Sequence, residues 1–192
     1  MPRRSKKRRR ILIDVDEVLA DFQTPAFDII NRLFGKSLTA YDYEVWDLFE
    51  LFTKEEGDAI RAEMGRPGVC ASLKVRPGAL DAVRELRDMA DVHPVTSPFD
   101  SPTWVAERYA WLQEHFQIPR RDVVFTESKY LVKGDALLDD RPDNITTWLK
   151  EHRRAVGMLW HIPNTRTMTQ YDHLRVKTWD EVISKVKKLA GV

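Results

Sequence analysis

The chain has 192 residues, 43% of them hydrophobic and 32% charged, which is the composition of a globular protein with room for one domain and a small insertion. No apolar run reaches membrane-spanning length, and only Ile11, Leu12 and Ile13 stand between the basic N-terminus and the first acid, so we expect neither a membrane segment nor a secretory signal peptide. Cys70 is the only cysteine; this excludes an intrachain disulfide and favours a reducing, cytoplasmic compartment.

The formal net charge of +1 hides an asymmetry between the N-terminus and the rest of the chain. Seven of the 31 basic residues lie within residues 3–10, so the remainder carries 24 basic residues against 30 acids. A basic tail of this kind at residues 1–10 is typical of segments that bind nucleic acid, an anionic membrane surface or an import receptor, and equally of solubilising arms. The sequence leaves these alternatives open.

The first predicted strand, residues 11–13, is followed directly by two carboxylates, Asp14 and Asp16. Its apolar run is typical of a buried strand in an open α/β sheet, where ligands bind beyond the carboxyl ends of the strands. An Asp-x-Asp pair at such an end can hold a hard cation and offer one carboxylate as a nucleophile, but taken alone it is better explained as a solvated turn. Its interpretation therefore depends on the later strand ends.

Residues 20–66 predict a small helical cap. Apolar side chains recur at helical spacing from Phe22 to Phe34, and Thr53-Lys54-Glu55-Glu56 has the pattern of a capping box at the start of another helix. The aromatic residues of this segment, Phe22 and Trp46 among them, are dense enough to line a pocket for a flat ring.

Beyond residue 77, strands and helices alternate. Strands are predicted at 92–96, 122–126, 136–140 and 155–160, and helices at 79–90, from Ser101-Pro102 onward, around Ile145 and after Thr178. This alternation predicts an α/β fold, a doubly wound, Rossmann-like, mainly parallel sheet with the cap inserted after the first strand. We assign residues 1–10 to the tail, 11–19 and 77–192 to the core, and 20–76 to the cap.

Three predicted strand ends carry polar groups that belong together chemically. They are Asp14 and Asp16, then Thr96 and Ser97, then Asp139 and Asp140, with Arg108, Lys129 and Lys133 between the second and third groups. The ends of parallel strands share one edge of a sheet, so these groups can converge on one site. Phosphoryl transfer needs such a set, with acids for a divalent metal, donors for phosphate oxygens and a cation.

At this point the sequence resembles a known superfamily. The haloacid dehalogenase superfamily of phosphatases has four ordered motifs that are similar to Asp14-Val15-Asp16-Glu17-Val18, Thr96-Ser97, a basic residue and Asp139-Asp140. Within this superfamily, the chain resembles the 5'(3')-deoxyribonucleotidase family. The segments that carry this resemblance are Val18-Leu19-Ala20-Asp21-Phe22, Thr96-Ser97-Pro98, Arg108-Tyr109-Ala110-Trp111 and Leu138-Asp139-Asp140-Arg141-Pro142-Asp143. The resemblance covers about residues 10–185 and leaves the basic tail outside.

The resemblance implies a role for each acid. Asp14 is expected to be the nucleophile that forms an aspartyl-phosphate, and Asp16 to protonate the leaving alkoxide and then deprotonate the attacking water. Mg²⁺ is expected as the cofactor, held by Asp14, by the backbone carbonyl of Asp16 and by Asp139, with Asp140 positioning a metal-bound water.

The resemblance also implies the binding residues. Thr96 and Ser97 are expected to bind phosphate oxygens, while Phe22 and Trp46 contact the base of a small nucleotide substrate. Contact with nucleic acid through the tail and a homodimer are the candidate associations, and no membrane association is expected.

The cation is the point where the chain departs from the family. Related enzymes commonly have Lys before the Tyr-Ala-Trp triplet, where this chain has Arg108. Arginine keeps the charge and can bind phosphate through two N–H groups. We therefore expect Arg108 to neutralise the phosphate, with Lys133 and Lys129 as substitutes.

The leading hypothesis is a magnesium-dependent phosphomonoesterase that hydrolyses deoxyribo- or ribonucleoside monophosphates through an aspartyl-phosphate. A polynucleotide 3'-phosphatase is the nearest enzyme alternative, because the basic tail would suit a DNA or RNA strand. From another class, the chain could be a nucleic-acid-binding protein on an inactive phosphatase fold, although all four motifs keep chemically competent residues.

Overall fold

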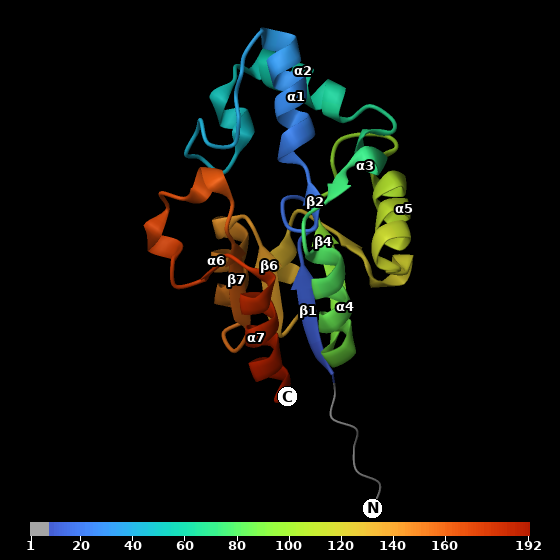
Figure 1. Ribbon diagram of the computed structural model, residues 1–192, viewed down its shortest axis with the longest axis vertical. Coiled ribbons are helices and arrows are strands. Elements are labelled where there is room, and N and C mark those ends of the chain that lie inside the picture. The colour runs from blue at the N-terminus through green and yellow to red at the C-terminus, as the bar shows by residue number, and fades with distance from the viewer. Residues whose placement is uncertain (1–7) are drawn as a thin grey trace, which may run out of the picture.

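A six-stranded parallel sheet forms the centre of the computed structural model, which describes residues 8–192 (Figure 1). The strand order is β5-β4-β1-β6-β7-β8, and every neighbouring pair in it is parallel. The strands are β1 (Arg9–Ile13), β4 (Ala90–Thr96), β5 (Val124–Phe125), β6 (Ala136–Asp139), β7 (Val156–Trp160) and β8 (Arg175–Val176). The predicted fold class is confirmed.

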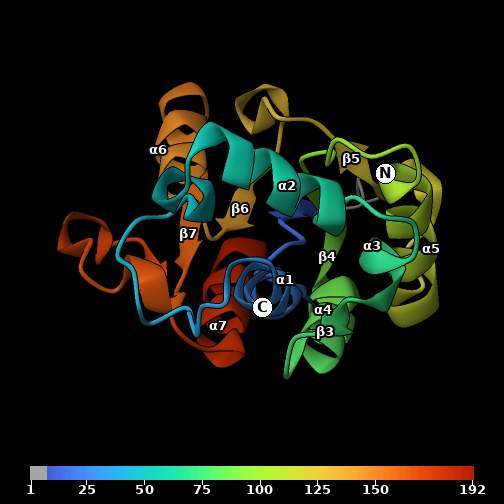
Figure 2. The ribbon, with the colours of Figure 1, turned by 90° about the horizontal axis from the view of Figure 1, so that it is seen from above.

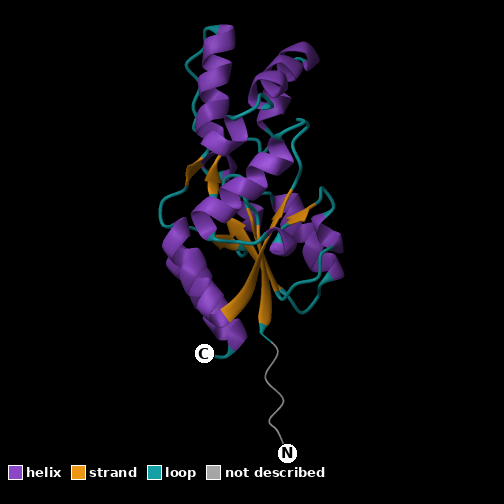
Figure 3. Cartoon of the chain, turned by 90° about the vertical axis from the view of Figure 1, so that its right-hand side faces the viewer, coloured by secondary structure: helices purple, strands orange, loops and turns teal. Residues whose placement is uncertain are grey.

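Helices cover both faces of this sheet (Figure 3). Successive side chains of β1 point to opposite faces: Ile11 and Ile13 pack with the buried residues of α4 (Ala79–Met89), α5 (Trp104–Phe116) and α7 (Trp179–Ala190). Leu12 packs on the other face with Ile145 and Trp148 of α6 (Pro142–Glu151). Burial from both sides explains why residues 11–13 of β1 are all apolar and do not alternate with polar residues.

The cap is inserted between two short strands, β2 (Ala20–Asp21) and β3 (Lys74–Val75), which pair in antiparallel fashion. Its helices are α1 (Gln23–Phe34), the 3₁₀ turn η1 (Leu48–Leu51), α2 (Lys54–Met64) and α3 (Val69–Ser72). Seen from above, α1 and α2 lie over the end of the sheet (Figure 2). We propose residues 20–76 as the cap, the range that the sequence predicts.

Local capping follows the sequence at one predicted box and departs from it at the other. At α2, the Thr53 hydroxyl accepts from Glu56 N–H and the Glu56 carboxylate accepts from Thr53 N–H, which completes the box. At α7, Thr178 accepts from the Glu181 N–H, but the Glu181 carboxylate reaches back to the Lys177 N–H instead. The second box is therefore shifted by one residue.

The start of α5 was predicted wrongly. Ser101 was expected to cap the helix with Pro102 at its first position, but α5 begins at Trp104 after Thr103. The Ser101 hydroxyl donates instead to the carbonyl of Gly65, 2.7 Å away, so it joins the core to the cap.

The remaining short elements are β8, which the sequence did not predict, and four 3₁₀ turns, η2 (Arg120–Asp122), η3 (Lys129–Leu131), η4 (Pro163–Thr165) and η5 (Thr169–Tyr171). Within residues 8–192 no helix has the length and apolarity needed to cross a membrane.

The last residues of the segment that we assign to the basic tail contact the core. Arg9 and Arg10 are the first residues of β1, and Arg8 donates to the Asp91 carboxylate at 2.9 Å. Residues 1–7 lie outside the described part of the chain.

Candidate active site

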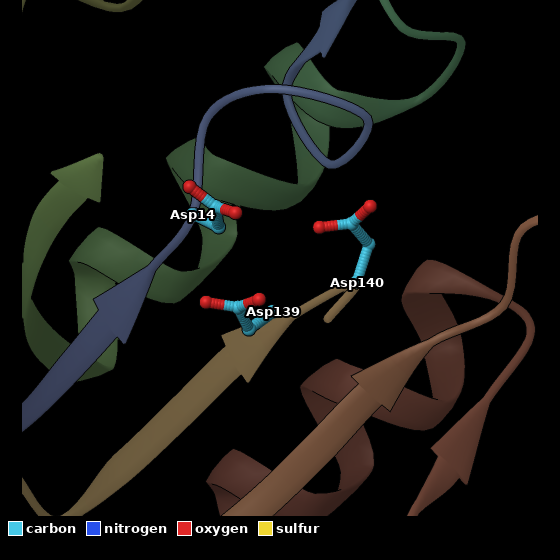
Figure 4. A group of neighbouring side chains, drawn as sticks. All are labelled: Asp14, Asp139 and Asp140. Carbon is cyan, nitrogen blue, oxygen red and sulfur yellow. The ribbon is translucent and has the colours of Figure 1, made fainter. Parts of the chain in front are cut away.

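Three carboxylates meet where β1 and β6 end. The Asp14 N–H donates to the carbonyl of Leu138 at 2.8 Å, which continues the parallel pairing one residue past β1 and places Asp14 beside Asp139. Asp139, the last residue of β6, and Asp140 point toward Asp14 (Figure 4). All three side chains are buried, and each has an oxygen within 4.8 Å of one on the other two.

A buried lysine lies among these acids. Lys129, the first residue of η3, is 3% exposed, and its Nζ is 2.7 Å from Asp14 Oδ1 and 2.7 Å from Asp139 Oδ2. Burial alone would lower the pKa of Lys129, but Asp139 and Asp14 hold the pKa above its ordinary value. Lys129 is therefore a fixed positive charge next to the expected nucleophile.

One lysine does not neutralise three carboxylates. Burial, offset in part by Lys129, raises the pKa of Asp14 to about 7. Burial, with repulsion from Asp14 and Asp139, also raises the pKa of Asp140 well above its usual range. The site thus has an excess of buried negative charge that a cation would relieve.

The donor set fits a hard divalent cation such as Mg²⁺. Carboxylate oxygens are the ligands that Mg²⁺ prefers, and Asp14, Asp139 and Asp140 supply three from a rigid strand edge. Asp139 is held in place because its Oδ1 accepts from the Arg141 N–H at 2.8 Å and from Asn144 Nδ2 at 3.2 Å. The carboxylate of Asp16 is not part of this group, so only its backbone carbonyl stays as a predicted ligand.

Arg108 lies in a different place from the one expected. Its side chain is fully buried between Trp104 and Trp111, with the guanidinium carbon 5.3 and 5.6 Å from the two ring centres. Arg108 Nη2 donates to Asp16 Oδ1 at 2.5 Å. Arg108 does not line the pocket and contacts Asp16 from behind, whereas Lys129 lines the pocket; Arg108 as the cation that neutralises the phosphate stays a prediction.

Lys133, the other cation expected at the phosphate, is also not brought to the site. It is exposed and lines a shallow hollow with Arg8 and Arg10, and its carbonyl accepts from Arg10 Nη1 at 3.2 Å. Because Arg10 lies near the start of β1, Lys133 is at the opposite edge of the sheet from the acids.

A pocket of about 370 Å³ lies over the acids and beneath the cap. Asp14, Asp16, Asp140 and Lys129 line it together with Thr96 and Ser97. The two hydroxyls make only long hydrogen bonds of 3.5 Å within the protein, so both are available to a ligand. Aromatic side chains complete the lining: Phe22, Trp46, Phe49 and Phe99.

Trp46 joins the cap to the acidic group. Its Nε1 donates to Asp140 Oδ2 at 3.0 Å, and the guanidinium of Arg141 lies 4.3 Å from the ring centre. Trp46, which we expect to contact the base, therefore lines the pocket. It also holds Asp140, one of the three neighbouring acids.

Glu17 is the structural residue that the sequence reasoning missed. It has a positive φ of 59° and is buried, and its carboxylate accepts from the N–H groups of Phe22 and Gln23 at 2.9 and 2.7 Å. Its second oxygen pairs with Arg76 Nη1 at 2.7 Å. Glu17 thus links the two chain segments that connect the core to the cap. The one feature of the sequence that indicates this role is an acidic residue shortly before a helix, but it lies outside the positions at which helices are usually capped.

The stability of the metal-free protein is expected to depend on pH through Glu17. Burial, opposed by Arg76, raises its pKa from 4.5 to about 7. Between these values the folded state binds more protons than the unfolded state, so this group makes the free energy of unfolding fall as the pH rises from 4.5 to 7. Glu17→Gln lacks this dependence. Relative to wild type, the variant should gain on the order of 3 kcal/mol between pH 4.5 and 7.5.

Urea denaturation of both proteins in EDTA measures this difference. Parallel stability profiles for wild type and Glu17→Gln would show that Arg76 and the two N–H groups keep Glu17 ionised throughout.

Comparison with known families identifies the chain. Residues 8–189 match the family described as 5' nucleotidase, deoxy (pyrimidine), cytosolic type C protein. Two relatives, each named "Putative 5'(3')-deoxyribonucleotidase", come from Bordetella bronchiseptica and Staphylococcus aureus. The first is 30% identical over 179 residues, covering 91% of this chain and 95% of the relative. The second is 33% identical over 136 residues, covering 70% and 75%.

Solved structures of low sequence identity share the fold. A haloacid dehalogenase-like hydrolase from Streptococcus pneumoniae is 12% identical with a TM-score of 0.64, over 92% of this chain and 97% of that one. Another from Xanthomonas campestris is 11% identical with a TM-score of 0.55, over 98% and 96%. With the fold shared with haloacid dehalogenase-like hydrolases and the family match spanning nearly the whole chain, this protein belongs to the 5'(3')-deoxyribonucleotidase family.

Proposed function

We propose that this phosphatase hydrolyses nucleoside monophosphates through an aspartyl-phosphate on Asp14, with Mg²⁺ as its cofactor. The observation that carries the proposal is the position of Asp14. It lies beside Lys129 and two further acids at the floor of a pocket with aromatic walls, of a size that suits a small molecule and not a polymer.

The proposed reaction begins at Asp14. A carboxylate oxygen attacks phosphorus, and the bond from phosphorus to the ester oxygen breaks while Asp16 gives its proton to the departing alkoxide. Water then attacks the phosphorus, Asp16 takes up its proton, and cleavage of the acyl-phosphate bond releases phosphate and restores Asp14. Arg108 keeps the Asp16 carboxylate in place for both proton transfers.

The charges of the reaction are matched by fixed groups. Lys129 pairs with Asp14 Oδ1, while Thr96 and Ser97 offer hydroxyls to the phosphate oxygens. Asp14, the backbone carbonyl of Asp16, Asp139 and Asp140 would hold Mg²⁺, which would supply the positive charge that offsets repulsion between these acids and the phosphate.

The nucleoside part of the substrate is assigned to the cap side of the pocket. Phe22 and Trp46 present aromatic rings there, and a base has flat faces to stack on them. Both deoxyribo- and ribonucleotides are included in the proposal, as are 5' and 3' phosphates.

The polynucleotide 3'-phosphatase alternative is less well supported. The basic segment joins the sheet at Arg9, the start of β1, whereas Asp14 follows its end (Figure 1). A strand held by Arg8, Arg9 and Arg10 would lie at the opposite edge from the pocket. We therefore propose that nucleic acid contacts the tail without being the substrate. A cytoplasmic location is proposed with it, and a homodimer stays a prediction.

The reaction is tested with purified protein and Mg²⁺ against 5'- and 3'-deoxynucleotides, ribonucleotides, sugar phosphates and 3'-phosphorylated oligonucleotides. Phosphate release is expected from mononucleotides, and Asp14→Asn should reduce it at least 10⁴-fold because the nucleophile is lost. Equal release by wild type and Asp14→Asn, or release from the oligonucleotides alone, would contradict the mechanism.

Two lysines provide a matched pair for the cation. Lys129→Gln should lower kcat/KM about 10²- to 10³-fold, because Asp14 then faces Asp139 without the positive charge between them. Lys133→Gln, the same change at the opposite edge, should leave kcat/KM within twofold. Steady-state kinetics, normalised to the folded fraction from circular dichroism, measure both. The assignment is wrong if Lys133→Gln is the more damaging change.

The tail is tested by deleting residues 1–7, which removes Arg3, Arg4, Lys6 and Lys7 and leaves β1 intact. Hydrolysis of mononucleotides should be unchanged, while affinity for a single-stranded oligonucleotide falls and its logarithmic salt dependence becomes shallower by up to about 3. Affinity and salt slope are measured by fluorescence anisotropy. An unchanged slope would remove nucleic acid as the partner of the tail.

A further inference from the structure

A buried asparagine connects the core to the cap beside the pocket. Asn164 lies in η4, after β7, and its side chain is fully buried. Its Nδ2 donates to the carbonyl oxygens of Val45 at 2.7 Å and Trp46 at 3.3 Å. Its Oδ1 accepts from Gln23 Nε2 at 3.1 Å. One amide therefore contacts both cap segments that line the pocket.

These contacts fix which way each amide faces. A backbone carbonyl can only accept a hydrogen bond, so the NH₂ end of Asn164 must face Val45 and Trp46. Its oxygen must then face Gln23, which leaves Gln23 as the donor. The order of donors and acceptors thus turns the oxygen of Gln23, Oε1, away from Asn164.

Gln23 is held at the pocket wall by its backbone as well. It is the first residue of α1, directly after Phe22, and its N–H donates to Glu17 Oε1 at 2.7 Å. The Gln23 side chain lines the pocket with Phe22 and Trp46. No donor among residues 8–192 hydrogen-bonds its Oε1, which is left as an oriented acceptor at the part of the pocket assigned to the nucleoside.

We propose that Gln23 is a specificity-determining residue and that Asn164 is its positioning residue. Gln23 Oε1 accepts a hydrogen bond from an N–H of the base or an O–H of the sugar, so a substrate with a donor at that point is preferred over one without it. This proposal rests on the nucleotidase function proposed above. A pocket that discriminates by a hydrogen bond does so because the analogue leaves a protein group unpaired.

The test compares thymidine 5'-monophosphate with two analogues, one methylated at N3 of the base and one lacking the sugar hydroxyl. Wild type should prefer the parent over one analogue by about 2- to 10-fold in kcat/KM, the range of a neutral hydrogen bond. The substrate pair for which Gln23→Met loses this preference identifies the donor. The donor is the base if the preference over the N3-methyl analogue is lost, and the sugar if the preference over the analogue without the hydroxyl is lost.

Gln23→Met keeps the length of the side chain and removes the acceptor, so the preference should fall to about one. Gln113→Met, the same change at an exposed position of α5, is the matched control and should behave as wild type.

Asn164 is tested through Gln23. Asn164→Ala frees the amide to rotate and should reduce the preference and raise KM more than it lowers kcat. In the double variant with Gln23→Met, Asn164→Ala should not change the preference any further, whereas a merely structural role would act equally on all three substrates.

The outcomes separate the two proposals. If wild type hydrolyses no nucleotide, the proposed function fails and this inference fails with it. If wild type hydrolyses nucleotides and Gln23→Met has the same substrate ratios as wild type in both arms, only the role of Gln23 is overturned.

Discussion

The crowding of buried carboxylates at the end of β1 and β6 is the constraint on which the site depends. Asp14, Asp139 and Asp140 are brought together by strand pairing, and the pKa values of Asp14 and Asp140 are raised because so much negative charge is buried. Lys129 offsets part of this charge. A group so placed destabilises the fold unless cations reach it, so the same crowding that raises these pKa values favours the binding of a cation.

Side chains around the pocket link the cap to the core. Glu17 and Arg76 link the two connecting segments, Trp46 bonds to Asp140, and Asn164 holds the loop that carries Trp46. Each contact ends at a residue that either lines the pocket or supports one that does. Movement of the cap would therefore shift the acids and the aromatic side of the pocket together. Such coupling can connect ligand binding to chemistry.

Sequence patterns were sufficient for the sheet and for the acids, because apolar runs followed by Asp14 and Asp139 mark strand ends that a parallel sheet must align. They did not show where the candidate cations lie. Whether Arg108, a helix residue, faces a pocket or lies behind an acid depends on its packing between Trp104 and Trp111, which spacing does not show. Glu17 and Asn164 were missed because their partners are distant in sequence or are backbone groups.

The length of β1 has a further consequence for electrostatics. Asp14 is five positions after Arg9, which at about 3.3 Å per residue puts the basic edge and Asp14 roughly 16 Å apart. The Debye length is about 8 Å at physiological ionic strength and about 30 Å at 0.01 M salt. Charges at one end of the sheet are therefore largely screened from the other at physiological ionic strength, whereas at 0.01 M salt they act on each other across this distance.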